Sequence, residues 1–204
     1  MTQMTPCFLP RKRGLLFLVS APAGTGKTTL IRRLVTEFPD LIPSISYTTR
    51  SPRPGEKDGV DYFFVSKEEF SHLIEEEAFL EWVTLHGTSY GTSKRWVEEQ
   101  LHAKKDVILT IDTQGVAIIR QKLPCISIFI EPPSEQELRR RLSSRQTESA
   151  EEIERRMAWS HHEMELRTKY DYCFVNDELE SAYHVLRSIF IAEQYALRHF
   201  IEEN

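Results

Sequence analysis

The chain has 204 residues, of which 40% are hydrophobic and 28% are charged, and its formal net charge is −5. This length suits one domain with small inserted subdomains, and the composition is ordinary for a globular protein with its own core. The acidic balance disfavours nucleic-acid binding, which normally needs a basic surface. The three cysteines form no CxxC pair, so we expect neither a zinc site nor a disulfide framework.

The first apolar run of the chain, at 15–19, is too short to cross a membrane or to form the core of a signal peptide. We therefore expect no membrane association, reduced thiols and a cytoplasmic location.

A strand–loop–helix pattern follows. Residues 14–20 form a nearly continuous apolar run, which is typical of a strand buried on both faces. Small residues occupy 21–29, and apolar residues then recur at helical spacing. Later apolar runs predict buried strands at 106–111, 125–130 and 172–176. Periodic patterns predict helices at 94–104, 134–144, 151–166 and 179–200. This alternation predicts an α/β fold with a parallel sheet flanked by helices.

Two segments interrupt the alternation. Residues 44–92 contain short aromatic strands and turns, and we interpret them as a small α+β insertion that binds substrate. Residues 132–157 are rich in arginine and nearly free of aromatic residues, which suits a helical lid. The predicted core comprises the remaining segments, 14–43, 93–131 and 158–204.

Residues 21–28, with the sequence APAGTGKT, nearly match the phosphate-binding loop (P-loop) motif called Walker A, with Ala21 in place of its first glycine. Glycines are needed there because backbone N–H groups must close around phosphate oxygens with no Cβ in the way. We expect Lys27 to reach the β- and γ-phosphates of a nucleoside triphosphate and the Thr28 hydroxyl to hold Mg²⁺. The loop residues predicted to bind this triphosphate are Ala21, Pro22, Ala23, Gly24, Thr25, Gly26, Lys27, Thr28 and Thr29.

A glycine-rich turn without a ligand is the alternative interpretation of this loop. The buried strand before it and the helix after it favour a P-loop instead. The motif alone does not separate a kinase from an ATPase or a GTPase.

Further motifs follow the loop in order. Residues 46–56 have the sequence SYTTRSPRPGE, and GVDY, FLEW and GTSYGT follow at 59–62, 79–82 and 87–92. IDTQG, PPS and VND then occur at 111–115, 132–134 and 175–177. Over roughly residues 14–200 this set resembles the guanylate kinase family. The resemblance implies a P-loop fold and Mg²⁺-dependent transfer of the γ-phosphate of ATP to GMP, and to dGMP, in purine metabolism.

The resemblance also implies a monophosphate site. The planar forks of Arg50 and Arg53 can each grip phosphate oxygens through two hydrogen bonds, and Tyr62 and Tyr90 add hydroxyl donors. The implied GMP-binding residues are Ser46, Arg50, Arg53, Glu56, Tyr62, Glu81, Tyr90, Thr92 and Asp112.

Glu81 is the residue expected to select the base. Guanine presents its N1–H and its exocyclic amine as two donors, and a carboxylate is the matching acceptor. Adenine has no such pair, so the unpaired carboxylate would penalise it. Ser46 and Thr92 are expected to complete the base pocket with their hydroxyl groups.

In the resembled family, arginines at the positions of Arg141, Arg145 and Arg156 converge on the transferred phosphoryl group. With Lys27 and Arg50 they are the predicted catalytic residues, because this chemistry needs alignment and charge stabilisation. The alternative for such a run is a solvated helix whose arginines pair with the glutamates at 135, 137, 148 and 152. We expect Arg139, Arg140 and Arg155 to serve surface solubility, helix contacts or adenine stacking.

Some positions depart from the family pattern or stay open. Thr110 stands where the family has Asp, and Gln146 where it has Gly. For Asp112 three roles stay open, namely contact with guanine, positioning of an arginine, or a water-bridged contact with Mg²⁺. Asn176 is a candidate for adenine recognition because its family counterpart sits there.

We interpret His161, His162 and Glu163 as surface residues and not as a metal site, and the tryptophans, including Trp159, as packing residues. Two other functions were weighed. One is a guanylate-kinase-like scaffold domain that binds phosphopeptides with little or no catalysis, which the intact Gly24, Lys27 and Arg50 oppose. The other is a kinase for AMP, CMP or UMP, which Glu81 opposes.

Overall fold

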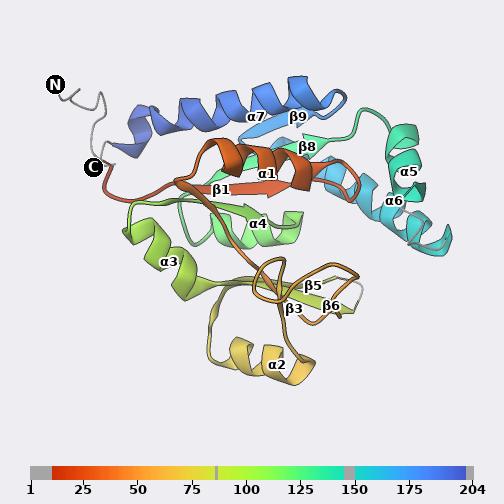
Figure 1. Ribbon diagram of the computed structural model, residues 1–204, viewed down its shortest axis with the longest axis horizontal. Coiled ribbons are helices and arrows are strands. Elements are labelled where there is room, and N and C mark those ends of the chain that lie inside the picture. Colours follow the sequence, from red (N-terminus) through yellow and green to blue (C-terminus); the bar gives the residue numbers. More distant parts are fainter. Residues whose placement is uncertain (1–10, 86, 145–149, 201–204) are drawn as a thin grey trace.

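The computed structural model describes residues 11–85, 87–144 and 150–200. Its centre is a five-stranded sheet in the order β2-β7-β1-β8-β9, and every pairing in it is parallel. This confirms the predicted parallel sheet. Figure 1 shows β1, β8 and β9 of this sheet. The strands are β1 (Leu16–Ser20), β2 (Leu41–Pro43), β7 (Asp106–Thr110), β8 (Ile126–Glu131) and β9 (Tyr172–Val175).

Helices cover both faces of this sheet. Side chains alternate along a strand, so Phe17 and Val19 of β1 pack with α1 and α7, whereas Leu16 and Leu18 pack with α3 and α4. Both faces are therefore buried, which explains why β1 is apolar throughout. These helices are α1 (Lys27–Glu37), α3 (Lys94–His102), α4 (Thr113–Arg120) and α7 (Leu179–Gln194). Within the described ranges, the helices are too short or too polar to span a bilayer.

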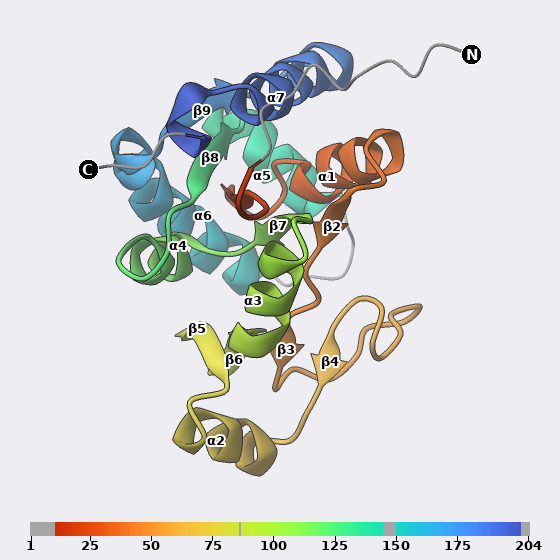
Figure 2. The ribbon, with the colours of Figure 1, turned by 90° about the vertical axis from the view of Figure 1, so that its left-hand side faces the viewer.

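A second sheet of four strands, in the order β4-β3-β6-β5, lies apart from the first (Figure 2). Helix α2 packs on it, where the rings of Phe70 and Phe79 stack with centroids 4.7 Å apart. Gly91 lies under Phe79, and a Cβ at Gly91 would be 2.9 Å from that ring. The elements are β3 (Tyr47–Thr48), β4 (Phe63–Phe64), α2 (Lys67–Glu75), β5 (Phe79–Leu85) and β6 (Thr88–Ser93).

Helices α5 (Glu135–Ser143) and α6 (Ala150–Glu165) lie beyond the carboxyl end of β1 (Figure 1). Leu138 and Leu142 of α5 form a small buried cluster with Met157 of α6. A short 3₁₀ turn, η1 (Leu166–Lys169), then leads into β9.

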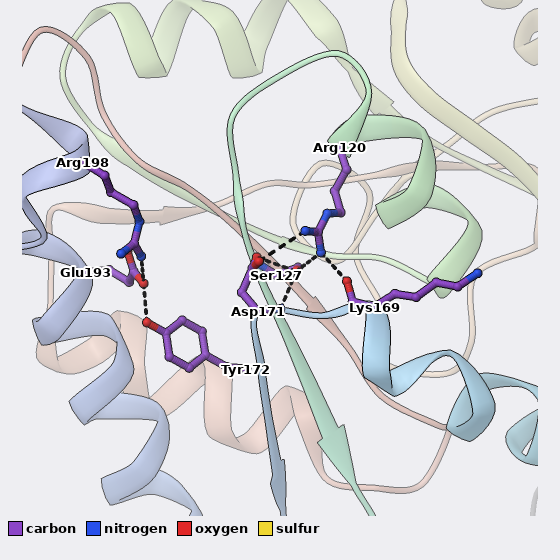
Figure 3. Close-up of polar contacts among 7 residues, drawn as sticks. All are labelled: Arg120, Ser127, Lys169, Asp171, Tyr172, Glu193 and Arg198. Carbon is purple, nitrogen blue, oxygen red and sulfur yellow. Dashed lines mark hydrogen bonds and ion pairs between the residues drawn. The ribbon is translucent and has the colours of Figure 1, made fainter. Parts of the chain in front are cut away.

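The last helix is shorter than predicted. The apolar pattern predicts a helix to residue 200, but α7 ends at Gln194 and a 3₁₀ turn, η2 (Leu197–His199), follows. The buried carboxylate of Glu193 accepts hydrogen bonds from Tyr172 and Arg198 (Figure 3). It also forms a hydrogen bond with the His199 ring. Residues five and six positions after Glu193 would not share its face of a continuous helix, so the chain must turn to make these contacts.

A second polar cluster fixes the starts of β8 and β9 (Figure 3). Asp171 accepts hydrogen bonds from the backbone N–H and the hydroxyl of Ser127, at 2.8 and 2.7 Å. Arg120, at the end of α4, donates to the Ser127 hydroxyl and to the Lys169 carbonyl. These contacts join α4, β8 and β9 at the end of the sheet opposite the phosphate loop.

Candidate active site

The predicted phosphate loop joins the carboxyl end of β1 to the first turn of α1, which begins at Lys27. Gly24 and Gly26 have φ angles of 91° and 96°, a left-handed conformation that favours glycine. A Cβ at Gly26 would also lie 2.6 Å from Nδ2 of Asn176. The loop thus has the glycine-dependent conformation that the motif predicts, next to the positive end of the α1 dipole.

A cavity of about 530 Å³ opens in front of this loop. It lies between the parallel sheet, the second sheet and α6, and the loop contributes Ala21, Ala23 and Lys27. Eight of the predicted site residues beyond the loop line it, namely Ser46, Arg50, Arg53, Tyr62, Glu81, Tyr90, Asp112 and Arg156. Segments far apart in the chain therefore meet at one site.

Arg50, which is predicted to grip a phosphate, is held in place by neighbouring side chains. Arg50 donates to both carboxylate oxygens of Glu56, each at 2.9 Å, and Glu56 also accepts the backbone N–H of Arg53 at 2.7 Å. The guanidinium carbon of Arg50 lies 5.2 Å from the centre of the Tyr62 ring. Arg50 keeps the pKa of Glu56 below its usual value. Glu56, predicted as a GMP-binding residue, thus contacts Arg50 and lies outside the cavity lining.

Glu81 also lines the cavity and is only 4% exposed. Its Oε1 accepts a hydrogen bond of 2.6 Å from the Thr92 hydroxyl, which the pairing of β5 and β6 places directly opposite. Burial, aided by the negative charge of Asp112, raises the pKa of Glu81 to about 7. Thr92 itself is buried and does not line the cavity, so its predicted place in the base pocket stays a prediction.

Asp112 caps the N-terminus of α4, where its Oδ1 accepts the backbone N–H of Gly115 at 2.9 Å. Its Oδ2 is buried and has no hydrogen-bond partner among the described residues. Burial raises the pKa of Asp112. Thr110, which stands where the family pattern has Asp, lies two residues before Asp112. It is exposed and lines the same cavity.

Helix α6 contributes the predicted Arg156 together with residues that the sequence interpretation assigned elsewhere. Arg155, Trp159 and Glu163 also line the cavity, although Glu163 was expected at the surface, Trp159 in packing, and Arg155 in surface, helix or adenine-stacking contacts. His161 and His162 are exposed as expected, but Glu163 is only 5% exposed. The spacing of Arg156, Trp159 and Glu163, at three and four residues, was the available signal that they share a helical face.

Glu163 and the phosphate-loop lysine, Lys27, both line this cavity, and their charges interact. Burial raises the pKa of Glu163 to about 7, while the nearby charge of Lys27 opposes that shift. Burial lowers the pKa of Lys27, and the charges of Glu163 and Asp112 oppose this in turn. The structure therefore gives Lys27 two acidic neighbours from different elements.

Arg141 of α5 lies against the back of the phosphate loop. Its guanidinium donates to the carbonyls of Thr25 and Asn176, both at 3.3 Å, and to Glu137 at 2.7 Å. Asn176 donates from its side chain to the Thr25 carbonyl at 2.6 Å, so its amide supports the loop. Glu137 also pairs with Arg140, as the solvated-helix alternative expects. Arg145 lies outside the described residues.

The parallel sheet, the glycine-dependent loop before α1 and the cationic cavity together define a P-loop nucleotide kinase. The profile of the guanylate kinase family matches residues 13–193. The chain therefore belongs to the guanylate kinase family.

Similar proteins agree with this assignment. A guanylate kinase of Protochlamydia amoebophila is 54% identical, over 91% of this chain and 94% of its own length. One from Geobacter sulfurreducens is 48% identical, over 90% of this chain and 91% of its own. The crystal structure of a guanylate kinase from Anaplasma phagocytophilum superposes with a TM-score of 0.76 at 30% identity, covering 91% of this chain and 89% of that one.

Proposed function

We propose that this chain transfers the γ-phosphate of ATP to GMP, and to dGMP, forming ADP and GDP or dGDP. One observation carries the proposal. A single cavity holds the P-loop lysine, a pre-oriented arginine for a second phosphate, and a buried carboxylate that matches guanine. A nucleotide kinase needs these three features together, because it must align two phosphates and select one base.

On the donor side, the backbone N–H groups of the loop and the ammonium of Lys27 bind the phosphates of ATP. On the acceptor side, Arg50, Arg53, Tyr62 and Tyr90 bind the GMP phosphate. A GMP phosphate oxygen forms a bond to the γ-phosphorus as the bond to the β–γ bridging oxygen breaks, and ADP leaves. No phosphoenzyme is formed, and the acceptor phosphate needs no protein base near neutral pH.

The cations around the cavity stabilise charge on the transferred group. Arg156 lines the cavity directly, and Arg141 sits behind the loop, from which it must turn to reach a phosphate. Arg145 stays a prediction from the sequence. The division into core, GMP-binding insertion at 44–92 and lid at 132–157 belongs to the same proposal, as do the cytoplasmic location and the roles of Asn176 and Asp112.

The residues present fit Mg²⁺. Oδ2 of Asp112, which has no hydrogen-bond partner among the described residues, and the hydroxyl of the exposed Thr28 at the start of α1 are oxygen ligands of the kind that Mg²⁺ prefers. Thr28 would hold the ion directly and Asp112 through water. When bound with ATP, Mg²⁺ supplies charge neutralisation at the β- and γ-phosphates.

The test is formation of ADP from ATP and Mg²⁺ with GMP, dGMP, AMP, CMP or UMP supplied one at a time. We expect turnover with GMP and dGMP alone. Lys27→Ala should abolish it, whereas Lys94→Ala, at an exposed position on α3, should not. Measurable GMP binding without turnover by the wild type would contradict the enzyme proposal and favour the scaffold function.

A further inference from the structure

Gly115 lies in the first turn of α4, three residues after the capping Asp112. It is buried, and its backbone N–H donates to Asp112. Its φ is not in the left-handed region, unlike those of Gly24 and Gly26. The backbone of Gly115 is helical, and a helix interior favours alanine over glycine. Backbone geometry therefore gives no reason for a glycine at this position.

The reason for the glycine lies in what packs against it. A Cβ at Gly115 would lie 2.9 Å from Oε2 of Glu81 and 3.3 Å from Cδ of Glu81. A third atom, Oδ1 of Asp112, would be 3.3 Å away. The first of these distances is shorter than any normal carbon–oxygen contact. The Glu81 carboxylate thus occupies the space that a side chain at position 115 would need.

This contact fixes one side of the carboxylate, and a hydrogen bond fixes the other. Oε1 of Glu81 accepts the Thr92 hydroxyl at 2.6 Å, while Oε2 rests against Gly115. Each carboxylate oxygen can accept more than one hydrogen bond, so this placement leaves capacity for a ligand. Helix α4 packs on β5, the strand that carries Glu81, so Gly115 and Glu81 lie on elements that are in direct contact.

We propose that Gly115 is a positioning residue for base selection. It leaves the space in which the Glu81 carboxylate holds both oxygens toward the base, one for N1–H and one for the exocyclic amine. A methyl group at position 115 displaces the flexible end of Glu81 and leaves the backbone intact. The inference rests on the proposed function, because it assigns Glu81 to guanine.

The test compares Gly115→Ala with the wild type on GMP and on inosine monophosphate, which has the N1–H but lacks the amine. We expect kcat/KM for GMP to fall about tenfold, mainly through KM, because a lost hydrogen bond to a charged group costs about that factor. The value for inosine monophosphate should fall less, so the preference for GMP narrows. Gln114→Ala, at the exposed neighbouring position, is the matched control and should change neither value.

Two further measurements separate positioning from a general structural effect. The thermal midpoint of Gly115→Ala should equal or exceed that of the wild type, since alanine favours the helix. In a Glu81→Ala background, Gly115→Ala should have no further effect on GMP affinity, because no carboxylate remains to be displaced.

An unchanged preference for GMP over inosine monophosphate in Gly115→Ala would overturn the inference, as would a variant that loses its folded state. The inference would also be overturned if Gly115→Ala lowered GMP affinity by the same factor in the Glu81→Ala background. A wild type that phosphorylates GMP without preferring it would instead contradict the assignment of Glu81. Failure of the wild type to use GMP at all would contradict the proposed function itself.

Discussion

At the scale of single residues, Glu81 combines two properties that conflict in the free protein. It is buried, which favours the neutral acid and raises its pKa to about 7. In the proposed function guanine offers two donors to it, which favours the carboxylate. On that proposal, binding of GMP requires that Glu81 be ionised, whereas with a pKa of about 7 much of the free protein holds the proton near neutral pH.

This conflict predicts a pH dependence. The carboxylate form of Glu81 is lost as pH falls through about 7, so kcat/KM for GMP should fall by about tenfold per pH unit below that value. The profile is measured from steady-state rates at limiting GMP. The phosphate of GMP also titrates, at about pH 6. The profile of Glu81→Gln should show only the fall caused by titration of the GMP phosphate. A wild-type profile identical to that of Glu81→Gln would contradict the assignment of Glu81 to guanine.

Glu56 acts through its neighbour. Because it holds Arg50 with two hydrogen bonds, its loss should leave Arg50 free to adopt other rotamers. The pair is about one-fifth exposed, so its effect is discounted for solvent screening. We expect Glu56→Ala to lower kcat/KM for GMP about tenfold. Glu99→Ala removes the exposed partner of Arg95 on α3 and should leave the rate unchanged.

At the scale of elements, the end of α7 depends on one buried acid. Glu193 is 1% exposed, and its carboxylate forms hydrogen bonds with Tyr172 of β9 and with Arg198 and His199 of the C-terminal turn. Leaving these donors without their acceptor should be costly, because buried polar groups need partners.

We therefore expect Glu193→Ala to lower the free energy of unfolding by about 2–3 kcal/mol and the thermal midpoint by roughly 5–10 °C. Thermal unfolding followed by circular dichroism measures this. Glu180→Ala, which removes an exposed partner of Arg33 between α7 and α1, is the control and should change the midpoint little. Equal midpoints for the two variants would contradict the role of Glu193.

At the scale of the whole molecule, the site exists because two sheets and one helix enclose the same space. The segments that follow β1 and β7 of the parallel sheet supply Lys27 and Asp112, β5 and the segment after β3 supply Glu81 and Arg50, and α6 supplies Arg156. No one of these parts contains both a donor and an acceptor phosphate site. Catalysis in this account is a property of their arrangement.

The parts of this arrangement that short-range patterns encode were predictable from the sequence. The apolar run of β1 and the glycines beside Lys27 are neighbours in the sequence. They therefore predict the strand, the loop and the start of the helix directly. The contact of Gly115 with Glu81 and the burial of Glu163 were not predictable in this way, because each depends on elements far apart in the chain. The early end of α7 likewise depends on Glu193 meeting β9, which helical periodicity cannot register.

The central claim is that this cavity transfers phosphate from ATP to guanine nucleotides and to no others. The most direct measurement supplies ATP labelled in its γ-phosphate, Mg²⁺ and equal concentrations of GMP, dGMP, AMP, CMP and UMP in one mixture, and then separates the products. The account predicts label in GDP and dGDP alone. Label in ADP, CDP or UDP, or in inorganic phosphate only, would contradict it.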